Sequence, residues 1–423
     1  MLLHKIFSIL IIGLLIVFNS YAQSQTDTIT EKNVKGILTF LASDKLKGRV
    51  NYTKEQRDAA DYIAKQFETY RLLPFPGFQY YVQPFTLRTG EMLFKNDLKW
   101  NGRKLSHQSY LDFSGSLNAR KTTLTNYHVV HIDSLTDSSL LHHWMDTINV
   151  LLWIKNNSAG SDTLRSGSLI IPHVSPRNEI LVVAAPDEPK SIQLAPNKTF
   201  SDAVLYNVVG VLPGRSKPNE AIIFSAHYDH IDSDPTGTKI GIFNGANDNA
   251  SGTTAVLELA RYFSLRDDNE RTIIFCLFAG EELGLLGSES FVKLVSAENV
   301  KAVINIEMIG RTNAAGKERF FITGSKFSDL ERIIKKNLEG ERVQNVLRKT
   351  DPANLFQRSD NYPFYQKGMV AHSIMCSDDN DPCYHQNCDT AGRIDFINMT
   401  DIIKAIAKAC RTLISGEDTP RQL

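Results

Sequence analysis

Short apolar runs alternate with helical patterns over residues 201–414, and this alternation limits the possible folds more than any other feature of the sequence. The runs AIIFSA (221–226) and TIIFCLF (272–278) are apolar at nearly every position, as expected of strands that are buried on both faces. Between them, apolar residues recur at helical spacing over 256–263. Alternating elements of this kind predict an α/β fold, with a central, mostly parallel mixed sheet and helices on both of its faces.

Similar patterns extend this prediction over much of the chain. Further strands are predicted at 207–212, 300–306, 319–324 and 370–375, and further helices at 330–338 and 402–413. Residues 23–85 are predicted to be mainly helical, because apolar residues recur at i, i+3, i+4 and i+7 from Ala60 to Phe67. We therefore interpret 23–85 and 201–423 as one domain.

Residues 86–200 separate these two segments and have a different character. They are rich in Thr, Ser and Asn and contain short apolar runs at 149–154, 168–172 and 180–185. This composition predicts a mostly β insertion with long loops.

The N-terminal residues have the pattern of an export signal. His4 and Lys5 precede an apolar run from Ile6 to Phe18, which is shorter than the about 20 residues that a membrane-spanning helix needs. The residues up to Ala22 then fit a signal-peptide cleavage site, and an uncleaved anchor is the alternative. We expect residues 1–22 to be removed, leaving a mature protein without a membrane span in the periplasm or outside the cell.

The charges of the chain are balanced, with 47 Lys and Arg residues and 47 Asp and Glu residues. This balance gives no indication of a nucleic-acid partner or of binding to an anionic membrane. The sequence also contains no G-x-S-x-G, H-E-x-x-H or Walker-type motif, which disfavours a serine hydrolase or a nucleotide-dependent enzyme.

Polar residues of metal-binding types follow the predicted strands, where each strand meets a loop. They are His227, Asp229 and His230; Asn247, Asp248 and Asn249; Glu281 and Glu282; Glu307; and Tyr384 and His385. Ligands of α/β sheets bind outside the carboxyl ends of the strands, so these side chains are expected to meet there. Histidines and carboxylates without Cys are the ligands of hydrolytic zinc, and a carboxylate that bridges two ions would make a two-metal site.

Several motifs in this region resemble those of the M28 family of zinc metallopeptidases, a group of exported aminopeptidases and their relatives. The motifs are SAHYDHI (225–231), GANDNASGTTAVLELAR (245–261), FAGEELGLLGS (278–288), RSDNYPF (358–364) and, nearer the N-terminus, LASDKLKGR (41–49). The resemblance covers most of 34–85 and 201–414 and implies the zinc exopeptidase fold. Residues 86–200 show no comparable match; some relatives carry a protease-associated domain at this position, and a divergent version of that domain is one interpretation.

The resemblance implies two zinc ions per chain and a role for each residue that matches a family motif. The metal ligands would be His227, Asp248, Glu282, Glu307 and His385. Asp248 would bridge the ions, Glu281 would be the general base, and Tyr384 would donate a hydrogen bond to the tetrahedral oxyanion. Asp229 would lie behind His227 and fix its tautomer, since residues two apart in an extended chain point the same way.

Two positions depart from the family's pattern. The family usually has Asp where this chain has Glu307, which is one methylene longer but remains an oxygen ligand for zinc. An ion pair with Arg311 on a loop is the alternative role for this side chain. Asn361 stands where relatives often have His, at a position that lines the site without binding metal, so this departure bears on substrate preference more than on activity.

The chain has five cysteines, and an exported protein can form disulfides. Cys276 and Cys410 lie in apolar patterns and are expected to be buried thiols. One disulfide is expected among Cys376, Cys383 and Cys388, with the Cys383–Cys388 pair favoured. A structural zinc site made by the three clustered cysteines and a nearby histidine is the alternative.

Together these features predict an exported, zinc-dependent aminopeptidase that hydrolyses the N-terminal bond of peptide substrates. Two alternatives share the fold. Relatives with one zinc ion cyclise N-terminal glutamine, and they would release a pyroglutamyl peptide rather than a free amino acid. A receptor-like protein without catalysis would have lost metal ligands, whereas the ligand positions and the base are all filled here.

Overall fold

The computed structural model describes residues 29–90, 97–105, 110–114, 124–132, 149–155, 179–195, 200–231, 241–347 and 354–423. It divides into two compact units, one made of Met1–Phe85 with Leu205–Leu423 and the other of Thr86–Val204. The predicted signal segment 1–22 and the apolar run 168–172 lie outside the described residues. Within the described residues, no helix combines the length and the apolar character that crossing a membrane requires.

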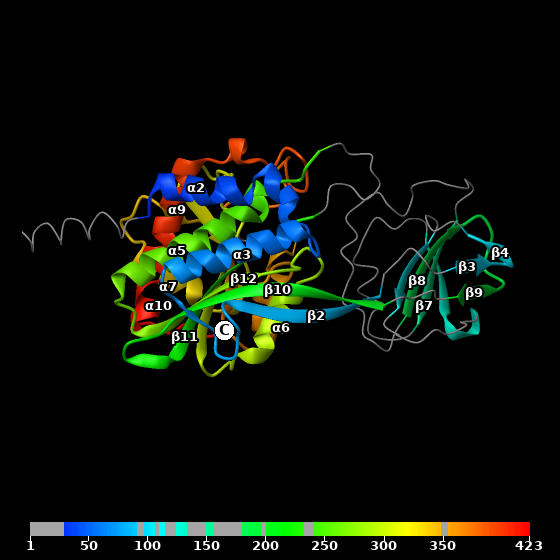
Figure 1. Cartoon of the computed structure of the whole chain (residues 1–423), viewed down its shortest axis with the longest axis horizontal. Coiled ribbons are helices and arrows are strands. Elements are labelled where there is room, and N and C mark those ends of the chain that lie inside the picture. The colour runs from blue at the N-terminus through cyan, green and yellow to red at the C-terminus, as the bar shows by residue number, and fades with distance from the viewer. Residues whose placement is uncertain are drawn as a thin grey trace, which may run out of the picture. The chain divides into compact units, whose positions relative to one another are not determined.

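A nine-stranded mixed sheet forms the centre of the larger unit (Figure 1). Its strand order is β1-β10-β12-β11-β13-β16-β14-β15, and β2 pairs with β10. The bounds are β1 (Leu73–Pro74), β2 (Val82–Gly90), β10 (Phe200–Leu212), β11 (Lys217–His227), β12 (Arg271–Phe278), β13 (Val300–Glu307), β14 (Arg319–Ile322), β15 (Gln344–Asn345) and β16 (Ala371–Met375). The four central strands β12, β11, β13 and β16 are parallel, whereas β10 runs antiparallel to β12 and β14 runs antiparallel to β16. The predicted α/β fold with a mostly parallel mixed sheet is confirmed.

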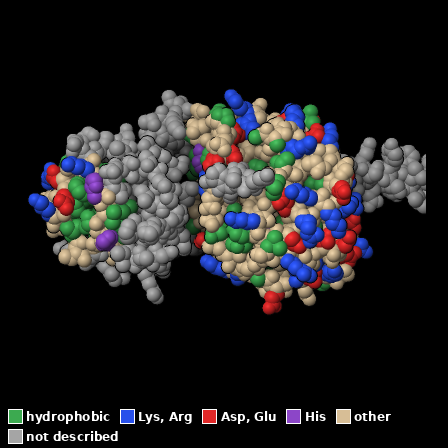
Figure 2. Space-filling view, turned by 180° about the vertical axis from the view of Figure 1, so that it is seen from behind, with side chains coloured by type: hydrophobic (Ala, Val, Ile, Leu, Met, Phe, Trp, Pro, Cys, Tyr) green, Lys and Arg blue, Asp and Glu red, His purple; other side chains and the backbone are tan. Residues whose placement is uncertain are grey.

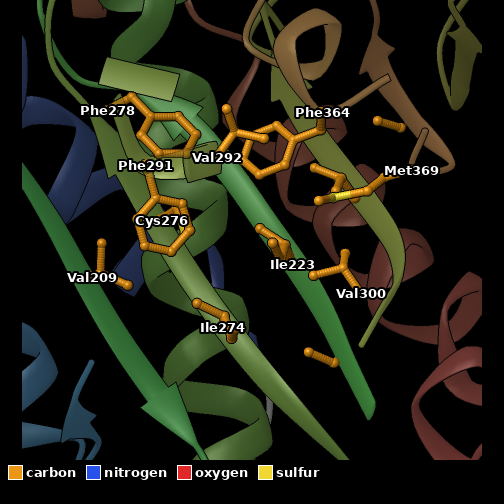
Figure 3. Close-up of a cluster of buried hydrophobic side chains, with 13 residues drawn as sticks. Val209, Ile223, Ile274, Cys276, Phe278, Phe291, Val292, Val300, Phe364 and Met369 are labelled. Atoms are coloured by element: carbon orange, nitrogen blue, oxygen red, sulfur yellow. The ribbon is translucent and has the colours of Figure 1, made fainter. Parts of the chain in front are cut away.

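Both faces of this sheet are buried, because neighbouring residues of a strand point to opposite sides. On one face, Phe224 of β11 stacks on Phe263 of helix α5 (Gly252–Arg266), with ring centroids 5.9 Å apart. On the other face, Ile223 belongs to a buried cluster with Phe291 of α6 (Leu286–Phe291) and Phe364 of α8 (Asn361–Gln366) (Figure 3). The helices on the two sides explain why the central strands are apolar throughout.

The remaining helices of this unit differ from the prediction in two places. They are α2 (Glu31–Leu41), a 3₁₀ segment (Asp44–Arg49), α3 (Lys54–Thr69), α7 (Leu330–Asn337), α9 (Phe396–Ala409) and α10 (Arg411–Ser415). The single helix predicted over 402–413 is broken at Cys410, which is the C-cap of α9 and the N-cap of α10. The prediction of mainly helix over 23–85 is right only as far as Thr69, because the following segment pairs with β10 as β1 and β2.

The smaller unit is built from strands, as predicted for the insertion. A three-stranded sheet contains β3 (Asp97–Trp100), β4 (Arg103–Lys104) and β9 (Ile192–Ala195). A four-stranded sheet contains β5 (Tyr110–Ser114), β6 (His128–Ile132), β7 (Val150–Lys155) and β8 (Glu179–Ala185). One buried cluster, which includes Trp100, Leu151 and Leu181, draws residues from both sheets.

The charged side chains on the visible face of the larger unit are of both signs and are intermingled (Figure 2). This distribution agrees with the equal numbers of acidic and basic residues in the chain. A surface of mixed charges does not generate the single-sign field that attracts a polyanion.

Candidate metal centre

The predicted site residues meet at the carboxyl ends of the parallel strands. His227 is the last residue of β11, and Glu307 is the last residue of β13. Glu281 and Glu282 follow β12 by three and four residues, since that strand ends at Phe278. Asp248 lies in the turn before α5, and His385 lies in the loop after β16. The fold therefore brings together all five predicted ligands and the predicted base.

One group of possible ligands, the His227 group, consists of His227, Asp248 and Glu307. The Nε2 atom of His227 lies 2.9 Å from Oε1 of Glu307 and 3.3 Å from Oδ1 of Asp248. Ser359 donates a hydrogen bond of 2.5 Å to the other carboxylate oxygen of Glu307. Glu307 is therefore placed where it could bind a metal ion together with His227 and Asp248.

A second group, the His385 group, consists of His385, Asp248, Glu282 and His230. The Nε2 atom of His385 lies 3.1 Å from Oδ2 of Asp248 and 3.2 Å from Oε2 of Glu282. Asp248 thus turns one carboxylate oxygen to each group, which is the arrangement that a bridging ligand needs. His230, which follows the same strand as His227 and has no role predicted from the sequence, has its Nδ1 atom 2.9 Å from Oε1 of Glu282.

The centre concentrates negative charge in a buried place. The side chains of Asp248, Glu307, Glu282 and Glu281 are 5%, 7%, 8% and 12% exposed, so water screens them little. Burial raises the pKa of Glu281 well above its usual value, although His227 opposes the shift, and the neighbouring Glu307 and Glu282 add to it. Buried carboxylates at such short range need cations between them.

The imidazoles respond to the same charges in the opposite direction. Burial lowers the pKa of His385, but Glu282 and Asp248 outweigh it and raise the pKa to about 10. Burial likewise lowers the pKa of His227, yet Glu307 and Glu281 raise it well above the ordinary value. Each ring therefore lies in an environment that favours positive charge, which a divalent cation can supply in place of a proton.

The residues fit zinc. Tetrahedral zinc at about 2.0–2.2 Å from each nitrogen or oxygen ligand requires ligand atoms about 3.3–3.5 Å apart. The nitrogen-to-oxygen separations within the two groups run from 2.9 to 3.9 Å. The Nε2 atom of His385 is buried and has no hydrogen-bond partner among the described residues, although it faces the carboxylates.

Asp229 lies behind His227, as predicted, and also supports a neighbouring turn. The Nδ1 atom of His227 lies 3.1 Å from the backbone carbonyl of Asp229, and 3.6 Å from its carboxylate. The carboxylate also accepts hydrogen bonds from the backbone amides of Glu281 and Glu282, both at 3.3 Å, and from Asn51 Nδ2 at 2.6 Å. Asp229 thus contacts His227 and fixes the Glu281–Glu282 turn through its side chain.

Two buried charged residues that the sequence analysis missed hold the loops of the centre. Arg49 donates hydrogen bonds to the backbone carbonyls of Tyr228, Leu41, Asn244 and Gly245, at 2.6–3.0 Å. Asp389 accepts hydrogen bonds from the backbone amides of Asn247 and Asp248 at 3.0–3.1 Å. Arg49 lies in the LASDKLKGR motif, so the resemblance to the family pointed to this segment. The role of Arg49 could not be predicted, because it depends on contacts with residues far away in sequence.

A small pocket adjoins the carboxylates. Its other lining residues include Met308, Leu355, Met375, Arg358, Asp379 and Tyr384. The ring of Tyr384 stacks on His385, with centroids 3.9 Å apart, and its hydroxyl accepts a hydrogen bond of 3.4 Å from Arg358.

Asn361 was expected to line the site, but its side chain is buried in the core instead. It donates a hydrogen bond to the carbonyl of Phe356 and accepts one from Ser373.

The loop that carries His385 is closed by a disulfide. Cys383 and Cys388 are bonded, as the favoured prediction had it, with Cα atoms 5.3 Å apart. Cys376 is a buried free thiol, and so are Cys276 and Cys410. The disulfide rules out the structural zinc site that was the alternative for this cluster.

Comparison with known proteins gives the same family as the motifs. Residues 207–410 match the sequence model of peptidase family M28. Aminopeptidase YwaD from Bacillus subtilis is 27% identical over 237 residues, which are 53% of this chain and 48% of that protein. Leupeptin-inactivating enzyme 1 from Streptomyces exfoliatus is 28% identical over 244 residues, 52% of this chain and 51% of that protein. The chain spans at most about half the length of most of the curated relatives that it matches.

Solved structures share the fold at low sequence identity. A zinc aminopeptidase from Bacillus subtilis superposes with a TM-score of 0.60 at 19% identity, covering 92% of this chain and 97% of the other. A leucine aminopeptidase precursor from Bacteroides thetaiotaomicron gives 0.54 at 14% identity, covering 92% and 98%. Family assignment rests on the sequence match and on the motifs that build the centre. Residues 207–410 of this chain therefore belong to peptidase family M28.

Proposed function

We propose that the protein is a zinc-dependent aminopeptidase with two zinc ions per chain. The observation that carries the proposal is the position of Asp248, which presents one carboxylate oxygen to His227 and the other to His385. Three further carboxylates surround it, and Glu307 and Glu282 belong to the two ligand groups. The named aminopeptidases among the relatives support the same activity.

Glu281 is the residue proposed to move the proton. Zinc ions in such a centre lower the pKa of bound water and polarise the scissile carbonyl. The Oε2 atom of Glu281 lies 3.9 Å from His227 Nε2, and Glu281 belongs to neither the His227 group nor the His385 group, although it forms a third possible ligand group with His227 and Glu282. A carboxylate in this position can accept a proton from water and pass it to the leaving amine. Tyr384, oriented by Arg358, can donate a hydrogen bond to the developing oxyanion.

The pocket supports cleavage at an N-terminus. Asp379 lines the pocket without belonging to either ligand group, and its carboxylate, which also contacts Arg358, can attract the free ammonium group of a peptide, which an internal residue of a chain lacks. Met308, Leu355 and Met375 give the same pocket apolar walls. An N-terminal residue with an apolar side chain is therefore the proposed substrate class.

Export to the periplasm or the exterior of the cell is part of the proposal. The apolar run from Ile6 to Phe18 and the following residues up to Ala22 carry this part. N-terminal sequencing of the exported protein should begin at Gln23, and a sequence that begins at Met1 would contradict it.

The experiment is to incubate residues 23–423 and zinc with aminoacyl reporters and short peptides, with and without a chelator. The proposal predicts free amino acids released from the N-terminus, loss of release with chelator and recovery on adding zinc. Pyroglutamyl peptides as the sole product would favour the cyclising alternative. No turnover of any substrate, with both ions bound, would favour a receptor-like protein.

A further inference from the structure

We propose that His230 is a third imidazole ligand of the metal centre and binds the ion of the His385 group through Nδ1. The inference rests on the proposed zinc centre and adds to it, because His230 is not among the five ligands predicted from the sequence. If it holds, four side chains bind this ion: His230, Asp248, Glu282 and His385.

The position of the imidazole is the first observation. His230 Nδ1 lies 2.9 Å from Oε1 of Glu282 and 3.9 Å from Oδ2 of Asp248. The ring of His385 approaches from another side, with its centroid 5.6 Å from that of His230 and the two planes at 70°. His385 Nε2 faces the same two carboxylates at 3.1 and 3.2 Å. One nitrogen or oxygen atom from each of the four side chains lies within 4.8 Å of the others, so a single ion can be bound between them.

The burial of the ring is the second observation. His230 is 1% exposed, and its Nε2 atom has no hydrogen-bond partner among the described residues. The polar contacts of the ring are thus all made through Nδ1, on the side of the carboxylates. A buried imidazole that makes so few polar contacts is costly unless a strong interaction compensates it, and a bond to a metal ion is such an interaction.

Gly245 makes room for this ring. A Cβ atom at this position would lie 2.6 Å from Cγ and Cδ2 of His230 and 2.3 Å from the backbone oxygen of Asp248. The residue also has a φ of 57°, which glycine adopts without the penalty of other residues. The loop that supplies the shared ligand Asp248 is therefore shaped to let the His230 ring reach the centre.

The extra ligand makes the two ions unequal. The His385 group offers four ligands, two imidazoles and two carboxylates, whereas the His227 group offers three. A zinc ion with four protein ligands is nearly closed to further ligands, and one with three keeps a position for water or substrate. The ion of the His227 group is therefore the one that exchanges more readily and the one left open for the reaction.

The test separates ligation from a hydrogen bond to Glu282. His230→Asn keeps an N–H group near the place of Nδ1 but removes the imidazole, and His230→Ala removes both. If His230 is a ligand, the Kd of the tighter zinc ion, measured by competition with a chromogenic chelator, should rise by more than about 100-fold in both variants. If His230 only positions Glu282, His230→Asn should bind zinc like the wild type, and the inference is wrong.

A matched control and a measurement without variants complete the design. His372→Asn makes the same change at an equally buried histidine whose ring contacts Ser328 and Thr323, and it should leave both zinc affinities unchanged.

X-ray absorption of the wild type with two zinc ions should show about 1.5 imidazoles per zinc if three histidines are ligands, and about 1.0 if two are. A value near 1.0 with two ions bound overturns the present inference alone. Fewer than two zinc ions in the wild type overturns the two-zinc proposal and this inference with it.

Discussion

The Nε2 atom of His227 lies 2.9 Å from Oε1 of Glu307, although 80 residues separate the two in sequence. Parallel pairing of β11 with β13 brings the ends of both strands to one edge of the sheet, and Ser359 holds the second oxygen of Glu307. Arg311 pairs with two other carboxylates, so the loop ion pair considered for Glu307 is not formed. The longer side chain of Glu307 thus reaches the imidazole of His227, as its proposed role as a ligand requires.

Glu307→Ala should release the zinc ion of the His227 group and leave the other ion bound. The variant removes one of three side chains in that group but none of the side chains around His385. Glu307→Asp should be far milder, because the carboxylate survives. Zinc content by elemental analysis, after dialysis against a weak chelator, measures both. If Glu307→Ala keeps the zinc content and the activity of the wild type, Glu307 is not a metal ligand.

Asn51→Ala should weaken zinc binding although Asn51 contacts no ligand group directly. The variant leaves one oxygen of Asp229 without its 2.6 Å hydrogen bond, and Asp229 holds the backbone of Glu281 and Glu282. We expect a loss of zinc affinity of about 10–100-fold, and a loss of about 1–2 kcal/mol in the free energy of unfolding.

Asn337→Ala is the matched control for Asn51→Ala. Its buried amide donates hydrogen bonds to Ala409 and Thr412, away from the metal ligands. The control should lose a similar amount of stability and keep its zinc affinity. Equal zinc affinities in the two variants would show that Asn51 serves stability alone.

Much of this site was predictable because its residues follow a local rule. Apolar runs such as TIIFCLF mark the buried strands, and the ligands come within a few residues of the strand ends. The contacts of Arg49 and Asn51 could not be predicted from strand ends, since their partners lie up to 196 and 178 residues away. The hydrogen bonds from the amides of Glu281 and Glu282 to Asp229 were not predicted, because alternation along a strand says where a side chain points but not which neighbour's amide reaches it. The break at Cys410 was missed, because apolar spacing continues through it.

Removing the Cys383–Cys388 disulfide should lower the affinity for the ion of the His385 group. His385 lies between the two bonded residues, which are five apart in sequence. Closing so short a loop contributes about 2 kcal/mol by restricting the unfolded chain. Mass spectrometry of a non-reduced digest should show the bond. Adding reductant should lower the thermal transition temperature of the wild type but not that of a Cys383→Ser/Cys388→Ser variant. A Cys383→Ser/Cys388→Ser variant that keeps wild-type stability and zinc affinity would contradict this prediction.

His372 should make the fold sensitive to mild acid. Burial lowers its pKa to about 4, from an ordinary value of about 6.5, so the unfolded chain binds a proton more readily than the folded one. The contribution of His372 to the free energy of unfolding is therefore fully present above about pH 6.5. It is lost as the pH falls toward 4, which lowers the free energy of unfolding by up to about 3 kcal/mol. Urea unfolding at pH 7 and pH 4.5 measures the change, and His372→Asn should show a smaller one. An equal change in both proteins would assign the acid sensitivity to other groups.

The proposed mechanism depends on the adjacent residues Glu281 and Glu282 having different roles, one as the general base and the other as a metal ligand. Glu282 lies in the group around His385, whereas Glu281 borders His227 at 3.9 Å. Glu281→Gln should therefore keep both zinc ions and the thermal transition of the wild type, while turnover of an aminoacyl reporter falls by about 10²–10⁴. The decisive measurement is zinc content and turnover on the same preparation of this variant. Two zinc ions with greatly reduced turnover is the predicted result, and loss of zinc or near-normal turnover would contradict the assignment of Glu281 as the base.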